Sequence, residues 1–500
     1  MKSVKISLIV AIQNIRKWRT NYRIWILVIL TMIFVQCYTK EISTNALAMG
    51  MKSSPWLYPF LYTDRYIRIL FMLPLIFIYC DAPFIDKNQI YILMRCKRKL
   101  WSIGQIIYIF MTSAMYFSLI AAMTIVLNIR NIEYMNDWGK VLGTLAFSNV
   151  PLVKGTAVTI STYILTYFTP TQAMFFTWLL SVLCGGILGL IIYGCNVISK
   201  SKVVGIVASG FLVILSAAVS GNEMAQWFSP VSWTTLNKLD VGKLTQYPTF
   251  TYVMVVYMTA IIIFKCMDYK SNRKKGCRSN DTGGINMEKL IQIKNLTKCF
   301  GETKVLDKIN VNFDRGHIYG IIGRNGSGKS MLMKCICGLV VPTSGEIIID
   351  NKKLGTDIDL PENLAGIIEE PGFLENYSAY KNLQFLSMIK NKIGKEEIIQ
   401  TLKSVRLDPY SKLHVGKYSM GMKQRLGIAQ AIMEKPEILI LDEPMNGLDN
   451  DGVMEMRKLF INLREEGTMI IIASHNKEDI EVLCDEVFEM EKGKLTPVQH

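Results

Sequence analysis

The stretch IYGIIGRNGSGKSMLMKC, residues 318–335, joins a short apolar run to a glycine-rich loop and then to a helix-forming segment. Glycines let the backbone wrap closely around an anion, so that successive N–H groups can point at its oxygens. Lys329 adds a positive charge, and the Ser330 hydroxyl stands at the start of the helix, where the helix dipole also favours an anion. The G-x-x-x-x-G-K-S spacing between a strand and a helix therefore predicts a phosphate-binding loop.

A second motif, ILILDEP at residues 438–444, predicts the catalytic acids. Its four apolar residues indicate a buried strand that delivers Asp442 to its end, where the carboxylate can hold Mg²⁺ through water. Glu443 is then a candidate for orienting or deprotonating the attacking water. His475 follows another strand-like run, MIIIAS, at the strand end where α/β sheets place ligand contacts. A lone histidine is more often structural, but beside these motifs we favour contact with a γ-phosphate.

These motifs lie in a region of alternating strand-like and helix-like segments, with strands such as LIQIKNL, INVNF and EIIID. Alternating strands and helices predict an α/β domain with a largely parallel sheet. We assign residues 288–500 to this domain. Residues 269–287 are polar and charged and show no periodicity, so we assign them to a linker.

The N-terminal region differs in composition. Residues 1–285 contain 28 Lys and Arg against 10 Asp and Glu, whereas the remainder contains 28 against 31. A basic region that also holds long apolar runs indicates a membrane protein and disfavours a nucleic-acid partner. The 11 cysteines include no C-x-x-C pair, which disfavours a metal site or a disulfide framework.

Six apolar stretches are long enough, or nearly so, to cross a bilayer. With a cytoplasmic N-terminus, the inside segments hold 19 Lys and Arg and the outside segments hold 8, as the positive-inside rule requires. The prediction is a helical membrane domain over residues 1–268, partnered by the lipid bilayer, with both of its ends and the α/β domain in the cytoplasm. The stretches are 24–38, 66–80, 106–128, 173–194, 203–220 and 250–267.

Two further segments of this region are amphipathic. Apolar residues recur at helical spacing over residues 4–18, which predicts a helix that lies on the membrane surface. The basic segment IYILMRCKRKLWS, residues 90–102, is either an interfacial helix that touches another domain or an ordinary positive-inside anchor. On the first interpretation, residues 87–99 contact the α/β domain near residues 369–380.

The interiors of the six stretches contain almost no ionisable residues. A pump that is driven by protons or ions usually keeps such a group at mid-membrane depth. The sequence therefore predicts that the energy source lies elsewhere in the chain.

Taken in order, GRNGSGKS, KYSMGMKQR, ILILDEP, NGLD and ASH resemble the motifs of an ABC transporter ATPase domain, over essentially all of residues 288–500. The resemblance implies ATP and Mg²⁺ as ligands. It implies that Phe300 stacks on adenine, that Glu443 is the catalytic glutamate and that His475 is the switch histidine. Asp442 becomes the Walker B aspartate, which with Ser330 holds the metal. The other implied nucleotide-binding residues are Gly323, Arg324, Asn325, Gly326, Ser327, Gly328, Lys329, Ser330 and Met331, and the implied D-loop residues are Gly447, Leu448 and Asp449.

One departure from the family pattern concerns the Q-loop, where Glu369 in GIIEEPGF stands in place of the usual glutamine. A carboxylate at this position either contacts Mg²⁺ more strongly or weakens communication with the membrane domain. Glu369 is therefore a third candidate metal ligand.

The other departure concerns the signature, usually LSGGQ, which reads YSMGM and implies the signature residues Ser419, Met420, Gly421 and Met422. A serine hydroxyl and backbone N–H groups at a helix N-terminus remain available for a γ-phosphate. We expect the Met420 side chain to point away, and Lys423 and Arg425 to add positive charge. An inactive signature is the alternative interpretation.

The membrane region is similar to that of type-2 ABC exporters, including peptide-antibiotic exporters of the bacitracin-resistance kind. The predicted function is that of a half-transporter that couples ATP hydrolysis to export of a small molecule, lipid or peptide. A membrane-anchored ATPase that signals without moving cargo is the alternative. In the family, one copy's signature covers the ATP held by another copy, so a second ABC subunit is implied. A homodimer is the simplest assembly, and a heterodimer with a related chain is the other.

Overall fold

The computed structural model describes residues 2–48, 50–134, 136–147, 158–242, 245–273 and 289–498. The chain divides into two compact units. We call one the helical unit (Asn14–Phe84 and Gln105–Ser271) and the other the α/β unit, which consists of Met1–Gln13, Ile85–Gly104 and Asn272–His500. The α/β unit thus takes in two short segments from the region that the sequence assigns to the membrane. Most of the predicted linker, 269–287, lies outside the described residues, and its first part continues helix α10.

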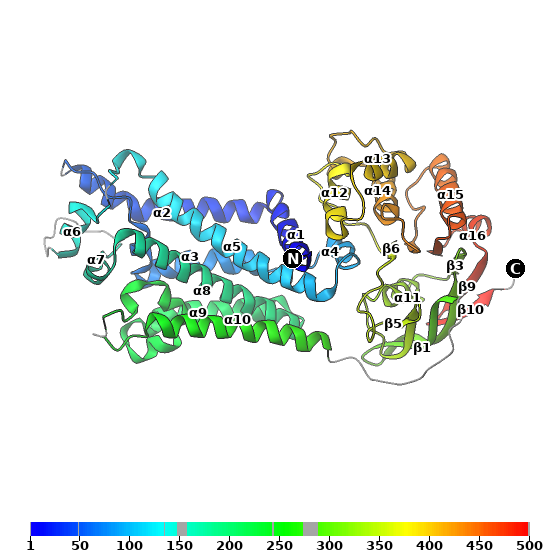
Figure 1. Ribbon diagram of the computed structural model, residues 1–500, viewed down its shortest axis with the longest axis horizontal. Helices are drawn as coiled ribbons and strands as arrows, with labels where there is room; N and C mark the ends of the chain where they lie inside the picture. The colour runs from blue at the N-terminus through cyan, green and yellow to red at the C-terminus, as the bar shows by residue number, and fades with distance from the viewer. Residues whose placement is uncertain are drawn as a thin grey trace. The chain divides into compact units, whose positions relative to one another are not determined.

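The helical unit is built from helices that run alongside one another (Figure 1). Close packing is made possible by small residues on α8, since a Cβ atom added at Gly186 would lie 2.2 Å from the Phe110 ring. The helices are α2 (Tyr22–Ala48), α3 (Arg65–Tyr79), α5 (Arg98–Val126), α6 (Gly139–Phe147), α7 (Thr162–Tyr167), α8 (Pro170–Ser199), α9 (Lys202–Ala218) and α10 (Phe250–Arg273).

Four helices of the described chain are long and apolar enough to cross a membrane: Tyr22–Thr44, Arg98–Val126, Pro170–Ser199 and Lys202–Gly221. The other two predicted stretches are also helical. Helix α3 has 15 residues, which at 1.5 Å per residue span less than the hydrocarbon core of a typical bilayer. Helix α10 has 24 residues, and its described apolar segment is Phe250–Phe264.

The α/β unit contains two sheets in its described residues. The larger has the strand order β10-β9-β3-β8-β7-β6 and is parallel except for the β9–β10 pair. The smaller, β2-β1-β4-β5, is antiparallel, so LIQIKNL, INVNF and EIIID do not belong to the parallel sheet that the sequence predicted. The strands are β1 (Lys289–Phe300), β2 (Thr303–Asp314), β3 (Ile318–Ile322), β4 (Ser344–Ile349), β5 (Lys352–Lys353), β6 (Leu364–Ile367), β7 (Ile438–Asp442), β8 (Met469–Ala473), β9 (Glu486–Glu491) and β10 (Lys494–Val498).

Helices cover the strands of this unit (Figure 1). Strands β3, β7 and β8 are buried almost throughout, which explains why their sequences are continuous apolar runs. The helices are α11 (Lys329–Ile336), α12 (Ala379–Lys390), α13 (Lys395–Ser404), α14 (Met420–Ile432), α15 (Asn450–Glu465) and α16 (Lys477–Leu483).

The first of the two short segments in the α/β unit belongs to α1 (Lys2–Arg16). Its Gln13 side chain is buried and donates a 2.7 Å hydrogen bond from Nε2 to the carbonyl of Phe385 in α12. Val4 and Leu8 remain exposed, which leaves part of the predicted apolar face free for a membrane surface.

The second segment, Ile85–Gly104, contains α4 (Lys87–Leu93), which lies beside α12 (Figure 1). Lys87 forms an exposed ion pair with Glu370, so the predicted contact between residues 87–99 and the region near residue 370 is confirmed. Arg95 is buried. Its Nε lies 3.3 Å from a Glu434 carboxylate oxygen and its Nη2 donates a 2.6 Å hydrogen bond to the Gln430 carbonyl. The basic segment therefore contacts the α/β domain, as the first of its two interpretations predicts.

Replacing Arg95 with Met should destabilise the α/β unit by about 3–5 kcal/mol, because the Glu434 carboxylate would stay buried without its partner. Lys390, 3.9 Å from the same carboxylate, moderates this loss. Adding Glu434→Leu should recover most of the stability, since an apolar pair can replace a buried ion pair. Denaturant unfolding of the detergent-solubilised full chain measures both effects.

The exposed pair provides the matched control. Lys87 and Glu370 side chains are 64% and 76% exposed, so Lys87→Met should change the unfolding midpoint little. Equal losses from Arg95→Met and Lys87→Met would contradict a special role for the buried pair.

Candidate functional site

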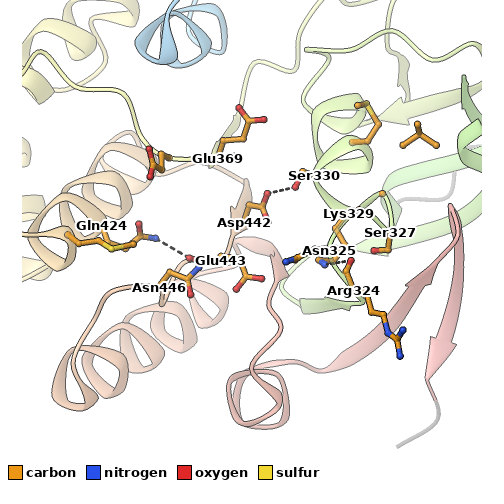
Figure 2. A pocket seen from close by; sticks show the side chains of 16 residues that line it. Arg324, Asn325, Ser327, Lys329, Ser330, Glu369, Gln424, Asp442, Glu443 and Asn446 are labelled. Carbon is orange, nitrogen blue, oxygen red and sulfur yellow. Dashed lines mark hydrogen bonds between the residues drawn. The ribbon is translucent and has the colours of Figure 1, made fainter. Parts of the chain in front are cut away.

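A cavity of about 510 Å³ opens in the α/β unit at the carboxyl ends of β3 and β7 (Figure 2). Because β3, β8 and β7 are parallel neighbours, the segments that follow them meet at this edge of the sheet. The cavity is lined by Val305, Arg324, Asn325, Gly326, Ser327, Gly328, Lys329, Ser330, Met331, Glu369, Glu370, Met420, Gln424, Asp442, Glu443 and Asn446.

The glycine-rich loop between β3 and α11 forms one wall. Gly323 has a φ of 149°, and a Cβ atom there would lie 2.4 Å from the carbonyl oxygen of Met490, so only glycine fits. The buried Lys329 side chain folds back over the loop, where its Nζ donates hydrogen bonds to the carbonyls of Gly323 and, at 3.2 Å, Arg324. The loop therefore presents a fixed cationic group beside its backbone N–H groups.

Ser330 and Asp442 face each other across the cavity (Figure 2). The Ser330 hydroxyl donates a 2.6 Å hydrogen bond to Asp442 Oδ2. Burial raises the pKa of Asp442, and the neighbouring Glu443 carboxylate acts in the same direction, whereas the hydrogen bond from Ser330 opposes the shift. With Glu369 these residues offer hydroxyl and carboxylate oxygens to one cavity, and such oxygens, together with phosphate oxygens and water, are the ligands that Mg²⁺ prefers.

Glu443 and His475 are brought together from the ends of β7 and β8. His475 Nδ1 lies 2.8 Å from Glu443 Oε2. Glu443 has a φ of 50°, which is unusual for a residue other than glycine, and its N–H donates a 2.9 Å hydrogen bond to the carbonyl of Ala473. The strained backbone and this bond fix the carboxylate beside the histidine at the edge of the cavity.

Glu369, the residue at the Q-loop position, lines the cavity but has a partner of its own. Its carboxylate forms an ion pair with Lys334 of α11, and its φ is 66°. The next residue, Glu370, pairs with Lys87, and hydrogen bonding from Lys87 lowers the pKa of Glu370. The two acids thus point to two different cations.

The signature stretch begins α14. Ser419 is the N-cap residue, and its Oγ accepts a 3.2 Å hydrogen bond from the Met422 N–H. Ser419 itself is exposed, and it is Met420 that lines the cavity of its own chain.

The structure gives two side chains of this stretch specific contacts. A Cβ atom added at Gly447 would lie 2.8 Å from Met420 Cγ, so the methionine packs on that glycine. The positive charge of Arg425 is paired, because its guanidinium hydrogen-bonds to Glu455 at 2.9 Å and lies 3.7 Å from Asp449. The methionine covers a glycine in the D-loop, and the arginine ties α14 to α15.

Several predicted residues lie outside the cavity lining. Phe300 is 53% exposed at the end of β1, with the Lys298 ammonium 4.9 Å from its ring centroid. Asp449 caps α15 by accepting a 3.1 Å hydrogen bond from the Gly452 N–H. The full set outside the lining is Phe300, Gly323, Ser419, Gly421, Met422, Gly447, Leu448, Asp449 and His475.

Four lining residues were not among the predicted site residues: Val305, Glu370, Gln424 and Asn446. Gln424 Nε2 donates hydrogen bonds of 3.2 and 2.9 Å to the carbonyls of Glu443 and Pro444, so it supports the backbone that carries the acid (Figure 2). The signal for Gln424 and Asn446 was their position within or beside the motifs KYSMGMKQR and NGLD. Val305 carries no such signal, because it reaches the cavity only through the packing of β2.

Residues 306–446 match the family model described as ABC transporter. The chain is 46% identical over 206 residues to "Uncharacterized ABC transporter ATP-binding protein YybJ" of Bacillus subtilis (strain 168), a match that covers 41% of this chain and 94% of that protein. It is 43% identical over 211 residues to "Bacitracin transport ATP-binding protein BcrA" of Enterococcus faecalis, covering 42% and 68% of the two chains. It is 39% identical over 206 residues to "Lantibiotic transport ATP-binding protein SrtF" of Streptococcus pyogenes, covering 41% and 89%.

Asp442→Asn should raise the melting temperature of the ligand-free protein at pH 8. A carboxyl whose pKa is raised by folding gives stability at low pH that is lost as pH rises through the folded pKa. The amide removes this loss while it can still accept the Ser330 hydrogen bond. The gain should shrink as pH falls toward about 4, where carboxyl groups become protonated.

Thermal unfolding over a pH series measures this difference. Glu481→Gln removes an exposed acid of α16 and should leave the melting temperature unchanged at both ends of the series. An Asp442→Asn protein that melts below the parent at pH 8 would show that burial of this carboxylate carries no net cost.

Proposed function

Because the chain belongs to the ABC transporter family and its α/β unit is an ATP-hydrolysing domain of that family, we propose that the whole protein is an ATP-driven exporter of the cytoplasmic membrane. The proposal assigns six membrane-spanning segments to residues 1–268, with both ends and the α/β unit in the cytoplasm. Four apolar helices of sufficient length and the excess of Lys and Arg in the inside segments support this topology.

The observation that carries the proposal is the place of Ile85–Gly104 within the α/β unit. Arg95 in this segment pairs with Glu434, just beyond the carboxyl end of α14, while the amino end of α14 carries the signature at the cavity. The same segment continues directly into the apolar helix α5. A displacement of α14 during the ATP cycle would therefore act on a membrane helix through a buried ion pair.

We assign roles to the residues of the cavity as follows. The loop from Gly323 to Met331 cradles the phosphates, and Lys329 pairs with the β- and γ-phosphates. Ser330 and Asp442, with Glu369 as a further candidate, hold Mg²⁺, which when bound neutralises phosphate charge. Glu443 accepts the proton of the attacking water, and His475 orients this carboxylate and contacts the γ-phosphate. Phe300 stacks on the adenine.

The names of two relatives support a substrate class for this chain. One is named as a bacitracin transport ATP-binding protein and the other as a lantibiotic transport ATP-binding protein. We propose a peptide or similar amphipathic molecule as cargo for this chain. The test is ATP turnover of the protein in proteoliposomes challenged with bacitracin and a lantibiotic as probes. Stimulation with ATP-dependent uptake into inside-out vesicles supports export, and turnover that no membrane-active peptide alters would favour the signalling alternative.

Glu443→Gln should leave ATP binding near the parent level and cut hydrolysis by about 10²–10⁴-fold, because a positioned general base contributes that much. Lys329→Ala should weaken nucleotide binding itself, since it removes the cation over the phosphates. Phosphate release and equilibrium ATP binding, measured on the same purified samples, separate the two effects. Parent-level hydrolysis by Glu443→Gln would show that another group accepts the proton.

A second subunit should complete each site, because Ser419 is exposed and does not line the cavity of its own chain. Lys329→Ala and Ser419→Arg, each nearly inactive alone, should regain part of the ATPase activity when co-expressed. A mixed dimer then has one site with both lesions and one intact site.

Isolation of the mixed dimer through two different affinity tags provides the control for assembly. A homodimer predicts activity from a single expressed chain, whereas a heterodimer requires a related partner chain. No recovery in a verified mixed dimer, or full activity in a purified monomer, would refute a signature that acts between subunits with independent sites.

A further inference from the structure

Three cationic side chains of the helical unit converge on the carboxyl end of α9. Arg68 of α3 donates a hydrogen bond from Nη2 to the Ser216 carbonyl at 3.4 Å. One turn further on, Arg65 Nη1 lies 3.2 Å from the Ser220 hydroxyl, and Lys238 Nζ lies 3.3 Å from the Ser220 carbonyl. The cluster thus concentrates positive charge within about one helical turn.

Arg68 is the unusual member, because its side chain is 1% exposed and yet poorly paired. Its Nε and Nη1 atoms have no hydrogen-bond partner among the described residues, and its one bond is long. Arginine keeps its charge at any physiological pH, so it cannot relieve burial by losing a proton. A buried cation without a partner is strongly unfavourable, and an ionisable group within such a helix is a candidate functional site.

Among the described residues no carboxylate forms an ion pair with Arg68, although the charge of Asp64 lies near enough to act on it. Asp64 is nearest in sequence, but its Oδ1 accepts hydrogen bonds from the N–H groups of Tyr66 and Ile67 at 2.8 and 3.0 Å. Asp64 is therefore engaged as the N-cap of α3. Arg65 and Lys238 likewise form no ion pair with a described carboxylate; each instead lies over a tyrosine ring, at 4.9 Å from the centroid.

Capping of α9 alone does not explain the cluster. Cations near a helix carboxyl end do stabilise its last carbonyls. The exposed Arg65 and the partly exposed Lys238 already hydrogen-bond to Ser220, and both side chains stay in contact with water. Arg68, the third cation, is fully buried and gains only one 3.4 Å hydrogen bond at this helix end. The desolvation cost of its burial is large compared with that gain.

We propose that Arg68, together with Arg65 and Lys238, binds the anionic group, phosphate or carboxylate, of an amphipathic molecule. Arginine suits such a group because its planar N–H fork can donate two parallel hydrogen bonds to it. The buried hydroxyls of Ser216 and Ser232 make the surroundings polar. The apolar part of the ligand has the exposed Tyr66 of α3, over which Arg65 lies, to pack against. That this ligand is the exported cargo rests on the proposed function, whereas its binding does not.

The test is equilibrium binding of radiolabelled dodecyl phosphate to the full chain in nanodiscs of neutral phosphatidylcholine, without ATP. Dodecanol, with the same chain and no charge, is the matched ligand control. Dodecyl phosphate should bind saturably and more tightly than dodecanol. Arg68→Gln should weaken it by about tenfold or more, as expected for loss of hydrogen bonds between charged groups. Arg130→Gln, which removes an exposed cation elsewhere in the helical unit, should bind as the parent does.

Two further arms complete the experiment. Arg68→Lys keeps the positive charge but lacks the planar N–H fork. Its affinity for dodecyl phosphate should lie between those of the parent and Arg68→Gln. If Arg68→Gln fails to fold, the double variant Arg65→Gln/Lys238→Gln carries the test and should weaken binding in the same direction. Nanodiscs that contain phosphatidylglycerol distinguish the source of the anion: displacement of the probe identifies a bilayer headgroup, and persistence of binding identifies a free amphiphile.

Equal binding of dodecyl phosphate and dodecanol by the parent, or parent-level binding by folded Arg68→Gln, would overturn the proposal. Because the measurement uses no ATP and no transport step, failure of the export proposal leaves its outcome unchanged. If dodecyl phosphate binds as expected but does not change ATP turnover, the anion site stands and its role as the cargo site is refuted.

Discussion

The parallel pairing of β3, β8 and β7 is the constraint on which the cavity depends. Parallel neighbours end at the same edge of a sheet, so the loop after β3, the two acids after β7 and His475 after β8 must meet there. The pairing register places Asp442 opposite Ala473, and the Glu443 N–H bonds to the carbonyl of that same alanine. A slip of one residue would turn the carboxylate to the other face of the sheet. The distances in the cavity are thus consequences of strand register.

Helix α14 links this edge to the segment that continues into α5. Its first residue, Met420, covers Gly447 and lines the cavity, whereas Gln430 and Glu434 at its other end hold Arg95. A helix transmits displacement along its axis because its backbone hydrogen bonds resist local deformation, and a close-packed interior resists compression. Helix α14 therefore connects the substituted signature at its amino end to the buried Arg95–Glu434 ion pair at its carboxyl end.

Sequence patterns predicted those parts of the site that depend on local order. A strand, a loop with fixed glycine spacing and a helix suffice to place Lys329 and Ser330, and apolar runs that end in acids suffice for Asp442 and Glu443. Pairings between distant segments were out of reach. Nothing in the sequence relates Glu369 to Lys334, because that pair depends on how the fold places the segment after β6 relative to α11. The antiparallel sheet was missed although its sequences carry a signal. Strand β2 mixes polar and apolar residues and alternates in burial, whereas β3, β7 and β8 are buried almost throughout. Hydropathy located the apolar runs but not the helix ends: the predicted stretch 24–38 lies within the longer helix α2.

The two buried arginines show what a hydropathy argument leaves out. Arg95 and Arg68 both lie in helical surroundings that exclude water, and burial of either guanidinium has a similar desolvation cost. For Arg95 the chain offsets that cost with the Glu434 carboxylate and two backbone carbonyls, those of Tyr91 and Gln430. For Arg68 the described chain offers one carbonyl at 3.4 Å. The two guanidinium groups have a similar desolvation cost but unequal partners within the chain, so we assign them different roles. Arg95 has a carboxylate partner within the folded protein, whereas Arg68 needs an anion from outside the chain to be paired in the same way.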